Sequence, residues 1–365
     1  MKTLDIYILK KFMKSLLGAI FAFSAIVLVV DFVERGWRMI ERYQIGFDIV
    51  ALYYVNYMPF YIILAFPVAM LVSTLFSMGS LAKNRELDVM KASGLSLYRV
   101  ALPILVAAFI LSLAVMFFAE FVLTDCERRK DEIKTVLIEK KNDIPKSKII
   151  RTNIKVPGEQ GWIILGKKYN VETEIGQDIK VHQVMENKIR KTYVAEKIIH
   201  SDSGWVLIKG VAQTHADVEK NLPESFVTFD TLWTPFLIQT PEMMAELPLP
   251  PRQESFFDLL RKIKEKEIVG EPAHKDWVEL YLKITFPFAN FILVLIGLPL
   301  AANPRRSGPS VGFGLSIIIS FIFFVLIRTG QSLGNNGKIP PLLAASVGDI
   351  FFLLIGTVLF IKARK

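Results

Sequence analysis

The chain has 365 residues, of which 52% are hydrophobic, and its mean hydropathy of +0.40 is too high for an ordinary soluble globular protein. Charged residues still make up 22%, so they must be segregated from the apolar ones. The net charge of +9 partly reflects basic loops, so it is weak evidence for nucleic-acid binding, and no such partner is expected. The single cysteine, Cys126, excludes an internal disulfide framework and a cysteine-rich metal site.

Six long apolar segments frame a polar insert, three before it and three after. Each is near or above the roughly 20 residues that a helix needs to cross about 30 Å of hydrocarbon. The second and third contain no Asp, Glu, Lys or Arg, which is rare in soluble core helices. The first is too long for a signal peptide and has no small-residue cleavage site before Asp31. The sequence therefore predicts an α-helical membrane protein with transmembrane helices near residues 16–32, 50–80, 100–119, 284–301, 310–327 and 342–361.

The loop charges predict the orientation. An even number of crossings puts both termini on one side, and an excess of Lys and Arg in short loops marks the cytoplasmic side. We therefore expect an inner-membrane protein with both termini cytoplasmic and the insert periplasmic. Thirteen cations lie on the side of the termini: Lys2, Lys10, Lys11, Lys14, Lys83, Arg85, Lys91, Arg99, Arg305, Arg306, Lys362, Arg364 and Lys365. Four lie in the opposite short loops: Arg35, Arg38, Arg42 and Lys338.

The insert shows short apolar or alternating runs separated by turn residues, a pattern typical of a sandwich, barrel or jellyroll. We expect seven strands, at residues 149–156, 162–169, 179–185, 190–200, 205–208, 211–215 and 226–229. An amphipathic helix is predicted over residues 254–269. The predicted organisation is transmembrane helices 1–3 in residues 1–123, a periplasmic all-β jellyroll-like domain with its connector helix in 124–275, and transmembrane helices 4–6 in 276–365.

No catalytic constellation is evident. Residues 161–167 have the spacing of a phosphate-binding loop, but Lys168 stands where the magnesium-binding Ser or Thr belongs, and the intervening residues indicate a strand. The four histidines have no metal-ligand spacing, and no Gly-x-Ser-x-Gly motif occurs. We therefore predict no catalytic residue, no metal site and no cofactor bound by this chain.

The turn between the second and third segments, residues 84–94, is the most specific local feature. Asn84 is placed to cap a short helix with two acidic residues near its positive end, and Gly94 is a natural stop. Two interpretations are open: a solvated interfacial loop, or a coupling helix that seats in a groove of a soluble ATPase, where a carboxylate meets an Arg. In the second, the apolar pair Leu87 and Met90 forms a knob, and the ATPase-contacting residues are Glu86, Leu87, Asp88 and Met90.

This turn also fits a longer pattern, since residues 85–94 read Arg-Glu-Leu-x-x-Met-x-Ala-Ser-Gly. The pattern resembles the coupling-helix region of the LptF/LptG family, the permease subunits of the lipopolysaccharide exporter. The resemblance covers essentially the whole chain, with further matches at Pro287 and at residues 297–300, 303–305 and 339–341. Residues 30–33 and the Ile-Pro-Pro element at 339–341 favour the LptG branch over the LptF branch.

The resemblance implies a transport subunit that is not itself an enzyme. In the family, one LptF-like and one LptG-like subunit form a heterodimer with a dimer of the ATPase LptB, which binds ATP and Mg. The pair extracts lipopolysaccharide from the inner membrane into a cavity between the subunits and passes it to a β-jellyroll bridge that includes LptC and LptA. By resemblance, Glu86 occupies the family's acidic coupling position.

Basic residues on the predicted outer side are candidates for substrate binding. Arg35, Arg38 and Arg42 are three and four apart, so they lie on one helical stripe. Arg grips phosphate bidentately, which suits the phosphates of lipid A, and the family carries basic residues close to the place of Arg35. Ordinary snorkelling to the interface is the alternative, and Glu34 and Glu41 lie near enough to pair with these arginines.

Two ionisable residues lie at membrane depth, Arg328 in the fifth segment and Asp349 in the sixth. Intramembrane charge usually faces a partner or a cavity. Because the two segments form a hairpin, the residues are expected to pair; alternatively, Arg328 contacts the substrate. Asp349 matches no family motif and is interpreted as structural.

Two other functions compete with transport. A membrane-anchored periplasmic scaffold or chaperone would need no cytoplasmic partner, and a lipid-modifying enzyme would need an acid/base pair or metal set that this sequence lacks. Co-purification with a soluble ATPase, lost on Glu86→Arg, separates transport from both.

Overall fold

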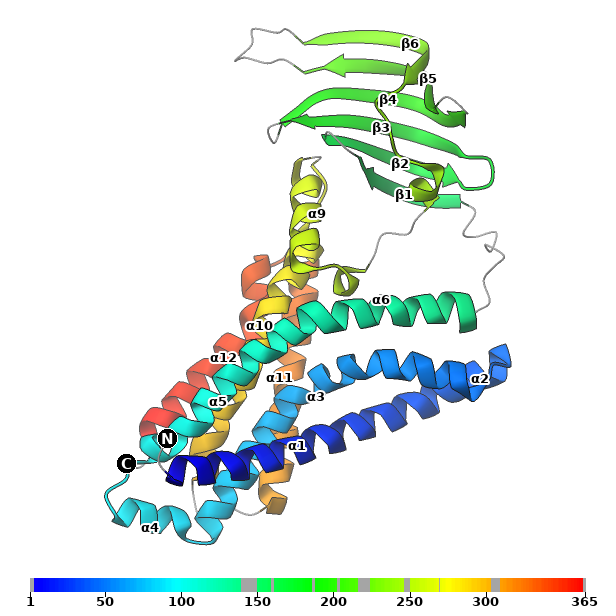
Figure 1. Ribbon diagram of the computed structural model, residues 1–365. Coiled ribbons are helices and arrows are strands. Elements are labelled where there is room, and N and C mark those ends of the chain that lie inside the picture. The colour runs from blue at the N-terminus through cyan, green and yellow to red at the C-terminus, as the bar shows by residue number, and fades with distance from the viewer. Residues whose placement is uncertain are drawn as a thin grey trace. The chain divides into compact units, whose positions relative to one another are not determined.

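The computed structural model describes residues 3–138, 150–158, 161–185, 188–201, 204–215, 224–245, 250–268, 270–302 and 309–363 (Figure 1). The chain forms a helical unit, Met1–Glu139, Pro251–Leu260 and Ala273–Lys365, and a β unit, Lys140–Pro250 and Arg261–Pro272. Some predicted features lie outside the described residues: the 303–305 match and the loop cations Lys2, Arg305, Arg306, Arg364 and Lys365.

Six helices in the described ranges are long and apolar enough to cross a membrane, which confirms the predicted segments. The first is continuous through α1 (Thr3–Asp31), the π-helical turn η1 (Phe32–Gly36) and α2 (Trp37–Tyr43). The second is α3 (Phe47–Lys83), which precedes the short α4 (Glu86–Ala92). The third runs through α5 (Leu97–Phe118), η2 (Ala119–Leu123), α6 (Thr124–Glu132) and η3 (Ile133–Ile138). The others are α10 (His274–Ala301), α11 (Pro309–Asn335) and α12 (Pro341–Lys362).

The third helix continues well beyond its apolar segment. Its extension α6 has Asp125 and Glu127 in the first turn and Arg129 and Lys130 in the last, an order that complements the helix dipole. The predicted domain boundary between residues 123 and 124 lies within this continuous helix. The helix continues past the end of the apolar run because the charges of α6 favour a helix.

Small residues allow α10 and α12 to pack closely. Thr285 Oγ1 of α10 donates a hydrogen bond to the carbonyl oxygen of Ala345 in α12 at 3.1 Å. A methyl group at Gly356 would lie 2.8 Å from Cγ1 of Ile296, so a larger side chain would push the helices apart. One hydrophobic core joins these helices to α3, α5 and the first half of α1. A second cluster, rich in tyrosine, packs the far end of the first helix against α3.

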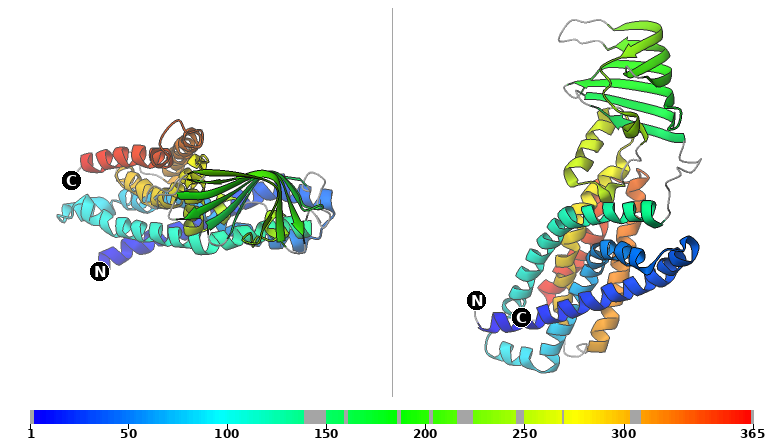
Figure 2. Two further views of the ribbon diagram at one scale, coloured as in Figure 1. Left: turned by 90° about the horizontal axis from the view of Figure 1, so that it is seen from above. Right: turned by 45° about the vertical axis from the view of Figure 1, so that its right-hand side comes forward.

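The β unit contains a six-stranded antiparallel sheet whose strands follow sequence order. The strands are β1 (Ile150–Pro157), β2 (Trp162–Asn170), β3 (Ile175–Met185), β4 (Lys188–Ser201), β5 (Gly204–Thr214) and β6 (Ser225–Thr234). Figure 2 shows the strands fanned out by their twist. Trp162, Tyr169 and Trp205 form much of its core, which Leu237 and Met244 from the following segment help to fill. The predicted inserted β domain is confirmed.

The seven expected strands appear as six among the described residues. The runs 205–208 and 211–215 belong to one strand, β5, which crosses Gly210 without turning. A methyl group at Gly210 would lie 2.3 Å from the carbonyl oxygen of Val194, so this glycine permits a close approach between β4 and β5. The phosphate-loop spacing at 161–167 falls on β2, which is paired on both sides and leaves no backbone nest for a phosphate.

Two histidines of the β unit share one threonine hydroxyl. His182 Nδ1 lies 3.0 Å from Thr192 Oγ1, and His215 Nε2 lies 2.9 Å from the same oxygen. Burial, followed by the positive charge of Lys180 and by His215, lowers the pKa of His182 below its usual 6.5. Unfolded His182 therefore takes up a proton at a pH where the folded residue stays neutral. The free energy of unfolding should fall as the pH drops below about 6.5.

We expect the variant His182→Gln to show a weaker loss of β-unit stability on acidification than the wild type. Gln keeps a polar group near Thr192 but takes up no proton. Hydrogen exchange of β3 and β4 in the full-length protein, at pH values above and below 6.5, measures the difference. His274→Gln, a substitution in the helical unit, is the control and should behave as wild type. The same acid sensitivity in both variants would assign the effect to other groups.

Candidate functional site

The predicted coupling turn forms a short helix at the same end of the helical unit as both chain termini (Figure 1). The helix α4 begins at Glu86, and its N-terminal cap is Arg85, whose φ of 61° is left-handed. The prediction that Asn84 caps this helix is wrong. Its Nδ2 instead donates to Glu86 Oε1 at 3.3 Å, because the left-handed residue between them turns the amide towards the first helical side chain.

Glu86 ties α4 to the first membrane helix. Its carboxylate accepts a hydrogen bond from the Tyr7 hydroxyl at 2.8 Å and lies 3.3 Å from Lys11 Nζ. Partial burial tends to raise the pKa of this carboxyl, but hydrogen bonds from Tyr7, Asn84 and Lys11, with the charge of Lys11, lower the pKa below its usual value. Glu86 is therefore a charged connection between α4 and α1.

The outward face of α4 differs from the predicted knob. Leu87 is only 1% exposed and belongs to the main core, and Met90 is half-buried against it. Val89, which no sequence pattern marks, is 65% exposed and lies beside exposed Asp88. The spacing of Leu87 and Met90 correctly placed them on one face, but that face packs on the bundle. An apolar contact with a partner would therefore come from Val89.

Other polar contacts fasten the same end of the helical unit. Arg99 Nη2 donates a hydrogen bond to Asp5 Oδ2 at 3.0 Å, and Nη1 forms an ion pair with Asp5 Oδ1 at 2.8 Å, so the two side chains join α5 to α1. Tyr98 donates its hydroxyl to the carbonyl oxygen of Phe360 in α12 at 3.2 Å. These contacts join the start of α5 to both α1 and α12.

A cavity of about 590 Å³ lies at the other end of the helical unit. Its wall comes from α3, α5 with η2, α10, α11 and the segment around the start of α9 (Phe256–Ile268). Most of the lining is aromatic or aliphatic, including Phe60, Phe117, Phe121, Phe286 and Phe324. An apolar cavity with a few convergent polar groups is the usual form of a binding site for an amphiphilic ligand.

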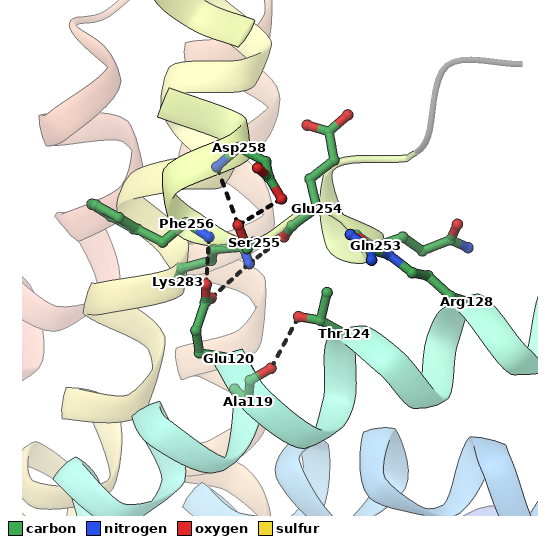
Figure 3. Close-up of polar contacts among 10 residues, drawn as sticks. All are labelled: Ala119, Glu120, Thr124, Arg128, Gln253, Glu254, Ser255, Phe256, Asp258 and Lys283. Carbon is green, nitrogen blue, oxygen red and sulfur yellow. Dashed lines mark hydrogen bonds and ion pairs between the residues drawn. The ribbon is translucent and has the colours of Figure 1, made fainter. Parts of the chain in front are cut away.

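Six polar or charged side chains enter this apolar wall: Glu120, Arg252, Glu279, Lys283, Arg328 and Gln331. Arg328 Nη1 donates to Gln331 Oε1 at 2.9 Å, and Gln331 Nε2 donates to Glu279 Oε1 at 2.6 Å. Arg252 stacks over the ring of Phe60, 5.2 Å from its centroid. Lys283 Nζ pairs with Glu120 at 3.0 Å (Figure 3). Of the three cations in this wall, only Arg328 was predicted. Arg252 and Lys283 were missed because no sequence pattern links residues 252, 283 and 328.

The predicted arginine stripe lies elsewhere. Arg35, Arg38 and Arg42 are all exposed on the continuous first helix, and none lines the cavity. Arg35 pairs with Asp31 at 3.4 Å, and Arg38 Nε donates to the carbonyl oxygen of Glu34. Neither predicted carboxylate pairing forms in the described part of the chain: Glu34 meets Arg38 through its backbone carbonyl, and the Glu41 carboxylate accepts from Trp37 Nε1 at 2.6 Å. The structure does not bring the stripe and Arg328 into one site.

The expected pair between Arg328 and Asp349 is not formed among the described residues. Arg328 bonds to Gln331, while Asp349 is 8% exposed and its Oδ1 has no hydrogen-bond partner in the described part of the chain. Arg328 thus lies in the cavity wall, while Asp349 is buried in α12. Within the described ranges, no three His, Cys, Asp or Glu side chains come close enough to hold a metal ion.

Comparison with known proteins gives one consistent result. A family model described as lipopolysaccharide export system permease LptF/LptG matches residues 6–362. The lipopolysaccharide export system permease protein LptG of Escherichia coli strain K12 is 24% identical over 368 residues, covering 99% of this chain and 98% of that protein. The LptG of Escherichia coli O6:H1 matches to the same extent. Since the family model spans almost the whole chain, and since six apolar helices with an inserted β domain accompany it, this protein belongs to the LptF/LptG family of lipopolysaccharide export permeases.

Proposed function

We propose that this chain is one permease subunit of an ATP-driven exporter that takes lipopolysaccharide from the inner membrane and hands it to a periplasmic β-jellyroll bridge. The observation that carries the proposal is the cavity at the end of the bundle remote from the termini. Its aromatic wall suits acyl chains, and Arg252, Lys283 and Arg328 suit phosphate groups. Family membership supports the role in lipopolysaccharide export and a subunit that is not itself an enzyme.

The cavity is too small to enclose a whole multi-acyl lipid, which favours a shared site. Ligand cavities of about 300–1,000 Å³ hold drug-sized molecules, so about 590 Å³ accommodates part of such a lipid. Large apolar side chains of α1 and α11, such as Phe21 at 76% and Phe321 at 68% exposure, are uncovered in the single chain. We infer that a paralogous LptF- or LptG-like subunit completes the cavity and that lipid covers the remaining surface.

We further propose that a soluble LptB-like ATPase dimer, which binds the ATP and Mg, docks at α4. Lys and Arg excess in the loops near the termini supports a cytoplasmic position for α4 and a periplasmic one for the β unit. Asp88 and Val89 form the exposed docking face, while Leu87 and Met90 anchor it from within. Glu86 then passes movement to α1 through Tyr7 and Lys11. LptC- and LptA-like proteins are the expected acceptors beyond the β unit.

The proposal is tested by purification from native membranes, followed by mass spectrometry of partners and bound lipid. A photo-reactive residue at Phe324, in the cavity wall, should crosslink to lipopolysaccharide. The same residue at exposed Phe226 of β6, outside the helical unit, reports whether cargo reaches the β unit. Purification of a stable chain with no ATPase, no paralogue and no glycolipid would favour a scaffold instead.

The arginine stripe gives a separate prediction. If Arg35 and Arg38 guide lipid phosphates at the interface, Arg35→Ala with Arg38→Ala should reduce lipopolysaccharide crosslinking at Phe324 severalfold, with Arg42→Ala as the single-charge comparison. Both side chains are exposed and their intrachain contacts are weak, so stability should change by less than about 1 kcal/mol. Unchanged crosslinking in the double variant would leave interfacial snorkelling as the explanation.

A further inference from the structure

The segment that returns to the membrane helices, residues 251–256, is fastened to the helical unit at several points (Figure 3). We call it the return segment. Arg128 Nε of α6 donates to the carbonyl oxygen of Gln253 at 2.7 Å, and the Gln253 amide donates to Asp131. Lys283 Nζ of α10 donates to the carbonyl oxygen of Glu254 at 2.7 Å. Two different membrane helices therefore hold one short stretch of backbone.

Glu120 is the centre of this arrangement, because both of its oxygens are used. Oε1 accepts the backbone N–H of Phe256, the first residue of α9, and Oε2 pairs with Lys283 Nζ at 3.0 Å. Next to it, Ser255 Oγ accepts the N–H of Asp258 at 3.1 Å. A carboxylate at this position satisfies an otherwise unpaired N–H and opposes the positive end of the helix dipole. Glu120 and Ser255 together satisfy two backbone N–H groups in the first turn of α9.

The same two side chains also face the lipid cavity. Lys283 is 21% exposed and Glu120 is 23% exposed, and both belong to the cavity wall. Glu120 lies in η2, a π-helical turn within the third membrane helix, and such turns are frequent at functional sites. An anion in the cavity would therefore contact the ammonium group of Lys283. That group now donates to the Glu120 carboxylate and to the backbone carbonyl of Glu254.

We propose that Glu120 and Lys283 form a cargo-sensitive latch on the return segment. The proposal rests on the function proposed above, since its ligand is the phosphate-bearing headgroup of an anionic lipid. When a lipid phosphate takes Lys283, the Glu254 carbonyl loses its donor and Glu120 loses its counter-charge beside a second anion. The return segment then loses its contact with α10 and the first turn of α9 is loosened, while the contacts of Gln253 with α6 remain.

The latch connects cavity occupancy to the β unit through the covalent chain. The first five residues of α9 belong to the helical unit, and Arg261–Pro272 belong to the β unit. If the start of α9 becomes mobile, the connection between the two units becomes mobile as well. A lipid bound in the cavity would loosen that connection. An empty cavity would keep it fixed.

The test is hydrogen exchange of residues 251–260 in the complex purified from native membranes. Saturating lipid A should raise the exchange rate of the Phe256 amide roughly tenfold, the size expected for losing one charge-assisted hydrogen bond. A glycolipid with similar acyl chains but no phosphate should leave it unchanged. Without any lipid, Glu120→Gln and Lys283→Met should already exchange fast and should no longer respond to lipid A.

Glu279→Gln is the matched control, because it removes a carboxylate from the same cavity wall without contact to the return segment in the described structure. It should keep slow exchange in the absence of lipid. Wild-type exchange in Glu120→Gln overturns the latch whatever the lipid does. If lipid A demonstrably binds and the exchange of the Phe256 amide stays slow, the latch is wrong and the proposed function stands. If lipid A does not bind, the proposed function fails, and the latch fails with it because its ligand is that lipid.

Discussion

Charge reversal at Glu86 is expected to reduce lipopolysaccharide export about 5- to 150-fold, the range of typical coupling free energies. The variant Glu86→Arg would set a cation against Lys11 Nζ, now 3.3 Å from the carboxylate, and would remove the acceptor of the Tyr7 hydroxyl. Because these contacts join α4 to α1, we expect the short helix to detach and co-purification of the ATPase to fall. Export into acceptor vesicles and the amount of bound ATPase measure the two effects in one preparation.

Milder variants separate docking from transmission. Tyr7→Phe keeps the charges and removes one hydrogen bond, so the ATPase should remain bound while export declines. Val89→Glu changes an exposed side chain and leaves the contacts of Glu86 in place, so ATPase binding should be lost first. Equal loss of ATPase binding in both would show that α4 is only a docking surface. Full export in Glu86→Arg would refute the coupling role.

The sequence predicted the features that depend on long runs of residues. Six apolar segments and an alternating insert are repeated signals, so the six membrane helices and the β domain were predictable. Details that depend on a single backbone angle were not. Arg85 takes a left-handed φ of 61° that displaces Asn84 from its expected role as cap, and Gly210 lies inside a strand where a turn was expected.

The cavity could not be predicted from one sequence because its charged groups come from distant parts of the chain. Glu120 and Lys283 are 163 positions apart, and Gln331 and Glu279 are 52 apart. Arg328 was found because a charge at membrane depth is conspicuous by itself. The predicted pairing of Arg328 with Asp349 was wrong. Two residues on one helical hairpin form a pair only if their side chains lie on the faces that meet, and the sequence does not determine those faces.

The second large effect is expected at Arg328. The variant Arg328→Glu would place a third carboxylate in a cavity that already holds Glu120 and Glu279. It would also remove the donor to Gln331 Oε1, the first link of the chain that continues to Glu279. Losing one charge-assisted contact with a phosphate and adding a repulsive charge should weaken lipopolysaccharide binding by at least about tenfold.

Arg328→Gln is the informative partner of this variant, because it removes the charge without adding repulsion and should give an intermediate loss. The amount of lipopolysaccharide crosslinked at Phe324, compared at equal protein, measures both. Arg42→Glu is the control: the same change of charge on an exposed arginine outside the cavity should preserve crosslinking at Phe324 better than Arg328→Glu does. If Arg42→Glu were the more damaging change, the phosphates would bind along the first helix rather than in the cavity. The comparison is informative because Arg328 lies in the cavity wall and donates to Gln331, whereas Arg42 lies outside the cavity and stacks over Tyr43, 5.8 Å from the ring centroid.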